Sequence, residues 1–309
     1  MQVVLDVALP VCAIILAGFA AGKAGLLGEA ASQAINQYVY WFALPAVLFI
    51  GLARTPLTEV LNLSFLGVFV GSTVLVYAIA FMIGRAGDKA GSGHYAQQAL
   101  TASFPNTGYM GIPIFTATWG ASKALPAIIG TVVVSAVMIA VAITAQEVIG
   151  SNGNFRTTVK DVARALSRNP LIASAVAGLA WTWLGLPLPT ALGNFFTILG
   201  GSAGPCALFA IGLFLAGRPL ECEWREVGWI IAMKLVVQPA LAWLLITLWF
   251  PLDRFWMGAA LLLAALPTGS LTFVVAQTYT VYVERTSQVI LASTVLSIPL
   301  LAAILAAYG

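Results

Sequence analysis

Two short polar stretches, each containing a proline, interrupt long apolar segments of this chain and carry the residues best suited to bind a ligand. The first is Phe104–Pro113, with the sequence FPNTGYMGIP, and the second is Pro267–Ser270, with the sequence PTGS. Proline has no N–H and its ring clashes with the preceding turn, so a helix cannot pass through either stretch undisturbed. In a bilayer each freed backbone group is costly unless protein or water satisfies it. The interruptions therefore predict positions that are buried in protein or that line a wet cavity.

The residue types at both interruptions suit a small charged ligand. A helical segment that starts after a break presents free N–H groups and partial positive charge, which favours an anion, whereas the end of the incoming segment presents carbonyls, which favour a cation. Asparagine and threonine are good N-caps, and glycine permits close approach to the backbone. The geometry alone leaves the sign of the ligand open. The candidate substrate-binding residues are Pro105, Asn106, Thr107, Gly108, Pro267, Thr268, Gly269 and Ser270.

A few polar residues elsewhere are further candidates. Lys234 lies well inside an apolar segment, where it either adds positive potential at a substrate site or extends its ammonium group to the membrane surface. Asn36 and Tyr40 precede Pro45, and they would face the same cavity if that proline kinks its helix. Glu147 would pair with Lys234, carry a proton or face water. No other carboxylate lies deep in an apolar segment, which favours an anion over a cation.

The composition excludes a soluble protein. Of the 309 residues, 61% are hydrophobic and 8% are charged, whereas a soluble domain carries about 25% charged residues. The apolar runs do not alternate as the strands of a transmembrane barrel would. No cysteine and histidine spacing indicates a metal, and no nucleophile–base set or phosphate-binding loop indicates an enzyme. We therefore expect an all-α polytopic membrane protein without a cofactor, a metal or a nucleic-acid partner.

Ten apolar segments must position the candidate residues in the lipid bilayer. A transmembrane helix needs about 20 residues. The expected spans cover residues 3–22, 33–53, 62–84, 95–119, 124–148, 170–184, 192–216, 227–250, 255–279 and 286–308. The two proline-containing stretches fall inside the fourth and the ninth span.

The two halves of the chain match when one is shifted along the other by 160 to 162 residues. The matching pairs are Gly18 and Gly178, Pro45 and Pro205, Phe49 and Phe209, Pro105 and Pro267, and Ser135 and Ser297. Each half holds five spans, and an odd number turns the second half upside-down relative to the first. We expect a five-plus-five inverted repeat with two broken helices that cross. Residues 1–148 would form the first repeat, 149–169 a cytoplasmic basic loop and 170–309 the second repeat.

The distribution of lysine and arginine between the loops predicts the orientation, because cytoplasmic loops carry an excess of both. The loops after the odd-numbered spans hold ten of these residues and the others hold three. The ten are Lys23, Arg85, Lys89, Arg156, Lys160, Arg164, Arg168, Arg218, Arg225 and Arg285, and the three are Arg54, Lys123 and Arg254. This bias predicts a multi-pass protein of the cell membrane with both termini outside the cytoplasm.

On these features the chain resembles the auxin efflux carrier family, in particular its bacterial branch of malonate and other dicarboxylate carriers. The run Asn106–Pro113 is similar to the family's Asn-Thr/Gly…Gly-x-Pro run in the broken fourth helix, and Lys234 with Pro239 is similar to its Lys-x-x-x-x-Pro pattern. The resemblance covers nearly the whole chain. It implies that the two broken helices cross in an X. It also implies that a core of spans 3–5 and 8–10 moves like an elevator against a scaffold of spans 1, 2, 6 and 7.

The sequence thus predicts a secondary or facilitative carrier of a small organic anion, such as an auxin-like or malonate-like carboxylate. Two alternatives stay open. One is a sodium-coupled organic anion symporter resembling the bile-acid carriers, and the other is a membrane receptor that binds on the same fold without transport. Coupling to protons or sodium and assembly as a homodimer are also open.

Overall fold

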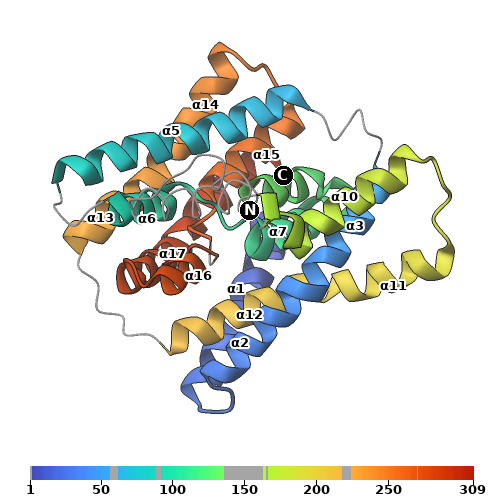
Figure 1. Cartoon of the computed structure of the whole chain (residues 1–309), viewed down its shortest axis with the longest axis horizontal. Coiled ribbons are helices and arrows are strands. Elements are labelled where there is room, and N and C mark those ends of the chain that lie inside the picture. Colours follow the sequence, from blue (N-terminus) through green and yellow to red (C-terminus); the bar gives the residue numbers. More distant parts are fainter. Residues whose placement is uncertain are drawn as a thin grey trace.

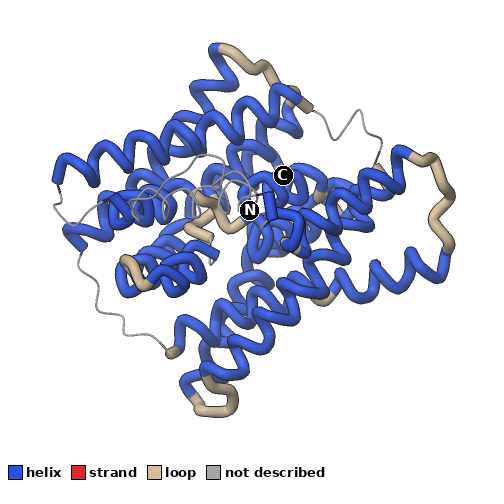
Figure 2. The backbone as a smooth tube through the Cα atoms, viewed as in Figure 1, coloured by secondary structure: helices blue, strands red, loops and turns tan. Residues whose placement is uncertain are grey.

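In the computed structural model the chain is helical throughout the part that the structure describes. That part comprises residues 2–55, 62–87, 92–135, 163–164, 166–217, 224–269 and 271–309. Figure 2 shows helices joined by loops, and the β-type pairing within these residues is a single isolated bridge. The prediction of an all-α fold is confirmed for the described residues.

Five helical stretches are long and apolar enough to cross a membrane, and each coincides with one of the expected spans to within a few residues. They are Glu29–Ala53, Leu63–Ala86, Thr190–Ala216, Arg225–Leu248 and Val283–Tyr308. Shorter apolar helices cover Ala13–Lys23, Leu125–Ser135, Pro170–Trp183 and Arg254–Ala265. The protein is therefore a multi-pass membrane protein, and the total of ten spans stays a prediction.

The helices follow one another in two series. The first series is α1 (Gln2–Lys23), α2 (Glu29–Tyr38), α3 (Leu44–Ala53), α5 (Leu63–Gly87), α6 (Ser92–Ser103), α7 (Ile112–Trp119), a 3₁₀ turn η3 (Ala121–Lys123) and the helix Leu125–Ser135, called helix 125–135 below. The second series is α10 (Pro170–Trp183), α11 (Thr190–Gly201), α12 (Ala203–Ala216), α13 (Trp224–Ala232), α14 (Gln238–Leu248), α15 (Arg254–Ala265), α16 (Leu271–Tyr279) and α17 (Val283–Tyr308).

Three π-helical turns each lie directly before a helix that has a proline in its first positions. They are η1 (Val39–Ala43) before α3, η2 (Thr107–Gly111) before α7 and η4 (Met233–Val237) before α14. Proline removes one intrahelical donor, and its ring collides with the carbonyl one turn earlier. A wider turn accommodates this collision without ending the helix. The prolines therefore set the places where these helices change their winding.

Two matched contacts between glycine and a main-chain carbonyl join the two halves. α1 packs along α12, and a Cβ on Gly18 would collide with the carbonyl oxygen of Phe209. α10 packs along α3, and a Cβ on Gly178 would lie 2.8 Å from the carbonyl oxygen of Phe49. Only glycine allows backbones to approach this closely. Both contacts therefore pack a helix of one half directly against a helix of the other.

The helices form two groups. One group comprises the helices of the expected spans 3–5 and 8–10, and the other comprises those of spans 1, 2, 6 and 7. Within the groups α5 packs along α6 and α14, and α1 packs along α12. In Figure 1, α5, α13 and α14 lie at the upper left, α3 and α11 on the right, and α2 and α12 at the bottom centre. Contacts of α12 with η2 and α7, and of α1 with α7 and α17, join the groups. Each group contains helices from both series.

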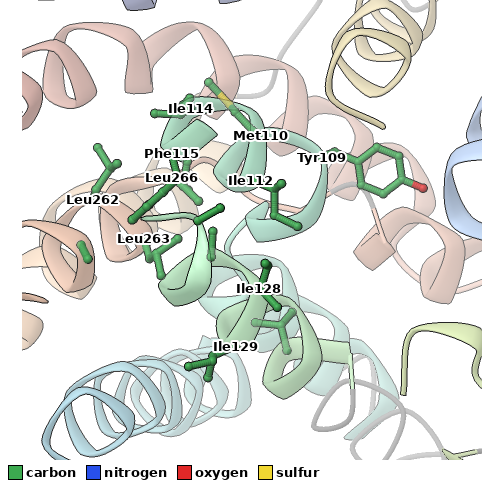
Figure 3. Packing of buried hydrophobic residues seen from close by; sticks show 14 of the residues in the cluster. Tyr109, Met110, Ile112, Ile114, Phe115, Ile128, Ile129, Leu262, Leu263 and Leu266 are labelled. Atoms are coloured by element: carbon green, nitrogen blue, oxygen red, sulfur yellow. The ribbon is translucent and has the colours of Figure 1, made fainter. Parts of the chain in front are cut away.

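Apolar side chains fix η2 and α7 against their neighbours. Met110, Ile112 and Phe115 belong to one buried cluster with Leu262 and Leu263 of α15 (Figure 3). Phe115 and both leucines are fully buried. This packing holds the segment that follows the first proline-containing stretch.

Candidate functional site

The two proline-containing stretches meet in space. Residues 104–106 lie between α6 and η2, and residues 267–269 lie between α15 and α16. They are joined by an antiparallel bridge. We call this bridged pair of segments the crossing.

Backbone hydrogen bonds hold the crossing together. The N–H of Asn106 donates to the carbonyl of Pro267 at 2.9 Å, and the N–H of Gly269 donates to the carbonyl of Phe104 at 2.9 Å. A Cβ on Gly269 would lie 3.1 Å from the Pro105 oxygen, so glycine gives the close approach that these bonds require. Each segment therefore satisfies backbone groups of the other in a region where lipid could not.

Thr268 fixes the crossing from the side of α6 and α17. Its Oγ1 donates to the carbonyl of Thr101 at 2.8 Å, and its N–H donates to Oγ of Ser293 at 3.2 Å. All three residues are buried. The hydroxyl of Thr268 is thus occupied by the protein itself.

A small cavity adjoins the crossing at the start of η2. The space open to the centre of a water molecule is about 20 Å3, and about 10–15 Å3 suffices for one water. A larger ligand can therefore enter only when the surrounding side chains move. The cavity is lined by Leu44, Phe104, Pro105, Asn106, Thr107, Gly108, Tyr109, Thr131, Val134, Ser135, Leu171, Gly269, Leu271 and Thr272.

Two polar groups of this lining have no hydrogen-bond partner among the described residues. They are Nδ2 of Asn106 and Oγ of Ser135. Asn106 is 3% exposed and Ser135 is 1% exposed. Such groups are rare inside proteins, because burying a donor without an acceptor is costly. The cavity therefore offers hydrogen bonds that the described residues leave unused.

The backbone at the start of η2 adds further donors. Asn106 precedes the turn, and its carbonyl accepts from the N–H groups of Met110 and Gly111 at 3.2 and 3.0 Å. Gly108 and Tyr109 lie in the first turn, whose N–H groups have no acceptor within their own helix. A Cβ on Gly108 would lie 3.2 Å from Cγ2 of Thr131, so this glycine lets η2 lie against helix 125–135.

Lys234 lies behind the crossing and does not line the cavity. Its Nζ donates to the carbonyl of Ala264 at 2.8 Å, and its side chain is fully buried. This carbonyl belongs to the last turn of α15, where the helix dipole favours a positive charge. This hydrogen bond thus satisfies a carbonyl at the end of the helix that leads into the second segment of the crossing.

The predicted site residues divide between the cavity and its surroundings. Pro105, Asn106, Thr107, Gly108 and Gly269 line the cavity, whereas Pro267 and Thr268 do not. Ser270 and Glu147 lie outside the described residues, as does most of the predicted loop 149–169.

Asn36 and Tyr40 do not line the cavity either. Asn36 is half-buried on α2. The hydroxyl of Tyr40 accepts from Nδ2 of Asn169 at 3.1 Å, and Oδ1 of Asn169 caps α10 by accepting from the N–H of Leu171 at 2.8 Å. Tyr40 therefore joins η1 to the start of α10.

Sequence reasoning missed helix 125–135 as a wall of the site. Thr131 and Ser135 are four residues apart and line the same cavity. One sequence signal was present, because Ser135 matches Ser297 between the halves. A serine in an apolar span is common enough that this match alone did not indicate a ligand.

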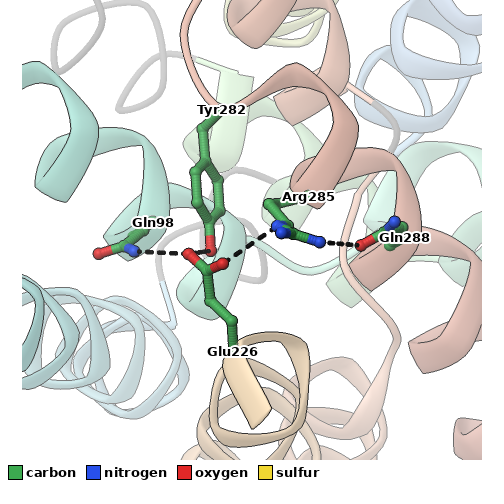
Figure 4. A network of polar contacts seen from close by, with 5 residues as sticks. All are labelled: Gln98, Glu226, Tyr282, Arg285 and Gln288. Atoms are coloured by element: carbon green, nitrogen blue, oxygen red, sulfur yellow. Dashed lines mark hydrogen bonds and ion pairs between the residues drawn. The ribbon is translucent and has the colours of Figure 1, made fainter. Parts of the chain in front are cut away.

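A second polar cluster, which was also not predicted, joins α6, α13 and α17 away from the cavity (Figure 4). Glu226 accepts from the hydroxyl of Tyr282 at 2.8 Å and from Nε2 of Gln98 at 3.3 Å, and it forms an ion pair with Nε of Arg285 at 3.0 Å. Nη1 of Arg285 also donates to Oε1 of Gln288 at 3.2 Å. Burial and the bond to Glu226 raise the pKa of the Tyr282 hydroxyl well above its usual value.

Sequence comparison establishes the family. The profile described as "Membrane transport protein" matches residues 3–305. The chain belongs to this family. The match spans nearly the whole chain, so the crossing and the cavity both lie within the family's region of similarity.

Named members of the family resemble the chain over different lengths. The "Putative malonate transporter" of Rhizobium meliloti (strain 1021) is 34% identical over 265 residues, which cover 85% of this chain and 83% of that protein. The "Uncharacterized transporter YfdV" of Escherichia coli (strain K12) is 26% identical over 300 residues, covering 93% and 92%. "Auxin efflux carrier component 1" of Arabidopsis thaliana is 29% identical over 145 residues, covering 45% and 23%.

These similarities confirm the predicted resemblance to the auxin efflux carriers. They make this member of the membrane transport protein family a transporter rather than an enzyme.

Proposed function

We propose that the protein carries a small organic anion across the membrane by elevator-type alternating access. The observation that carries this proposal is the crossing, in which two proline-containing segments join by backbone bonds beside a cavity with donors that the described residues leave unused. Secondary transporters place their substrate sites at such discontinuous helices. The substrate carboxylate would lie at Asn106, Thr107 and Gly108, beside Gly269. Lys234 would add positive charge from behind the crossing.

The chemistry of the cavity favours an anion over a cation. The unpartnered group of Asn106 is an amide nitrogen, which can only donate. The first N–H groups of η2 are donors as well, and the positive end of a helix dipole favours negative charge. A carboxylate satisfies these groups, whereas a sodium ion would need acceptors in their place.

The paired glycine contacts support the five-plus-five inverted repeat. Gly18 and Gly178 correspond at a shift of 160 residues, and so do Phe49 and Phe209. In one contact Gly18 faces Phe209, and in the other Gly178 faces Phe49. A two-fold axis that maps Gly18 onto Gly178 and Phe209 onto Phe49 would turn one contact into the other.

The position of the cavity supports a moving core. Its polar lining comes from the crossing, η2, helix 125–135 and α16, within spans 4, 5 and 9. Leu44 of α3 and Leu171 of α10 complete the lining, and they come from spans 2 and 6. A core that slides past these apolar side chains would carry the anion across the bilayer.

A transport assay tests the proposed function. Purified protein in proteoliposomes should exchange internal malonate for external radiolabelled malonate in counterflow, and Asn106→Ala should reduce this exchange at least tenfold. Replacing sodium with choline tests the sodium-coupled alternative, and varying the pH gradient tests proton coupling. Carboxylate binding without counterflow would identify a receptor. Unchanged exchange by a well-folded Asn106→Ala variant would show that the site lies elsewhere.

A cross-link between the two groups tests the elevator motion. A Cβ on Gly204 of α12 would lie 3.4 Å from Cβ of Pro113 in α7, close to the roughly 3.5–4.5 Å of a disulfide. With the three native cysteines replaced, oxidised Gly204→Cys/Pro113→Cys protein should stop transporting and recover on reduction.

The matched control for this cross-link lies within the proposed core. A Cβ on Gly84 of α5 would lie 3.5 Å from Cβ of Tyr95 in α6. The oxidised Gly84→Cys/Tyr95→Cys protein should keep transporting, because both residues would move together. Undiminished transport by the cross-linked Gly204→Cys/Pro113→Cys protein would exclude relative motion of the two groups.

A further inference from the structure

Corresponding polar residues in the two halves have different hydrogen-bonding states. At a shift of 162 residues, Asn106 corresponds to Thr268 and Ser135 corresponds to Ser297. In the second half, Thr268 and Ser297 donate to main-chain carbonyls at 2.8 and 2.9 Å. In the first half, the amide nitrogen of Asn106 and the hydroxyl of Ser135 have no partner among the described residues. Within the described residues, the side chains of the second half are therefore satisfied, whereas those of the first half have no partner.

The two unused groups belong to one cavity although they come from different helices. Asn106 precedes η2 and Ser135 is the last described residue of helix 125–135, yet both line the same space. Both side chains are more than nine-tenths buried, so bulk water does not satisfy them. Because an unpartnered buried polar group is unfavourable, two of them in one cavity indicate groups that a ligand satisfies.

The ligand that fits both groups presents acceptor oxygens. The Asn106 amide nitrogen can only donate, and the Ser135 hydroxyl can donate while it also accepts. A carboxylate has two oxygens and can therefore accept from both. Hydrogen bonds to a charged acceptor are stronger than those between neutral groups, which makes a carboxylate the best partner for this pair.

The rest of the described lining suits an uncharged part of the ligand. Leu44, Leu171 and Leu271 come from α3, α10 and α16, and Phe104 and Val134 add two more apolar side chains. Thr107, Tyr109, Thr131 and Thr272 are polar but uncharged, and the hydroxyls of Thr131 and Thr272 already donate to main-chain carbonyls. A second ionised carboxylate against these side chains would be a buried charge in apolar surroundings, which is strongly unfavourable. The cavity therefore matches one carboxylate attached to an apolar or uncharged remainder.

We infer that the cavity recognises a single carboxylate through Asn106 and Ser135, and that the second half of the crossing gives no side chain to the ligand. Ser135 is thus a substrate-positioning residue. The inference rests on the proposed function and names its substrate class. The substrates are monocarboxylates, or dicarboxylates with one carboxyl group protonated.

A matched pair of serine variants tests the role of Ser135. In purified full-length protein, Ser135→Ala should weaken malonate binding about tenfold or more, because it removes a hydrogen bond to a charged group. The same variant should leave the stability of the ligand-free protein unchanged or raised, since it removes an unpartnered group. Ser297→Ala should do the reverse, with lower stability and a malonate Kd within about twofold of wild type. Equal malonate affinity of Ser135→Ala and wild type would overturn the role.

A matched pair of ligands tests the single-carboxylate specificity. Monomethyl malonate has one carboxylate, and malonate has two at a pH where both are ionised. We expect monomethyl malonate to bind wild-type protein at least as tightly as malonate, and dimethyl malonate not to bind. Malonate affinity tenfold higher than that of the monoester would overturn this part. If wild-type protein neither binds nor exchanges any of these compounds, the proposed function itself fails together with the inference.

Discussion

The two segments of the crossing each contain a proline, at Pro105 and Pro267, but their side chains differ in hydrogen bonding. Asn106 faces a cavity and keeps an unused donor, whereas Thr268, at the corresponding position, is held by Thr101 and Ser293. Both segments share the same backbone bridge. The difference teaches that two segments can share a backbone bridge while their side chains divide the tasks. We expect the first half to bind the ligand and the second half to hold the structure.

The largest effect is expected where the two segments touch through backbone. A Cβ on Gly269 would lie 3.1 Å from the Pro105 carbonyl oxygen, which cannot rotate away. Gly269→Leu should therefore abolish transport and lower the free energy of unfolding by about 3 kcal/mol, as measured by counterflow and by thermal unfolding in detergent.

Two glycine variants are the controls for Gly269. A Cβ on Gly108 would meet side-chain atoms of Thr131 and Leu44, at 3.2 and 3.4 Å, so Gly108→Ala should destabilise the protein less. Gly201 is exposed with open space around it, so Gly201→Leu should have little effect. If Gly269→Leu is as stable as Gly201→Leu, the crossing is not held by close backbone contact.

Substitution of the corresponding residues Thr268 and Asn106 should separate stability from binding. Thr268→Val removes the hydrogen bond to the buried Thr101 carbonyl and should lower the free energy of unfolding by about 1–3 kcal/mol. Nδ2 of Asn106 has no hydrogen-bond partner among the described residues, so Asn106→Ala should lower the stability less than Thr268→Val does. It should weaken malonate binding at least tenfold, because it removes a donor to the carboxylate. Thermal unfolding and calorimetric titration measure the two quantities. If both variants lose stability and affinity alike, the two halves share one task.

The smallest effect is expected at the polar cluster around Glu226. It connects α6, which leads into the first segment of the crossing, to α13 and α17. The side chains of Arg285 and Glu226 are 23% and 32% exposed. Partly solvated ion pairs contribute little, so Glu226→Gln should lower the free energy of unfolding by less than about 1 kcal/mol. A loss as large as that of Thr268→Val would instead make this cluster a second fixed point of the crossing.

Much of the fold could be predicted because its signals are local. Apolar runs of the length of a bilayer identify helices, and prolines locate the interruptions at Pro105 and Pro267. The candidate site was predictable in part, since Asn106, Thr107 and Gly108 follow such a proline directly. Thr131 and Ser135 were not predictable as lining residues, because their span shows no interruption and a buried serine usually bonds within its own helix.

The role of Lys234 shows the same limit. The sequence showed that Lys234 lies inside an apolar span. It left open whether this side chain acts at a substrate site or extends to the membrane surface. Its contact with the Ala264 carbonyl depends on how α14, its preceding turn η4 and α15 pack. No spacing within either segment contains that information.

The sequence by itself determined that this chain is an α-helical transporter of the membrane with interruptions at Pro105 and Pro267. It did so because hydrophobicity and the missing N–H of proline act on neighbouring residues. Only the tertiary structure decided which break keeps free polar groups. That outcome depends on whether a side chain from a distant helix, such as Ser293 beside Thr268, comes within hydrogen-bond distance.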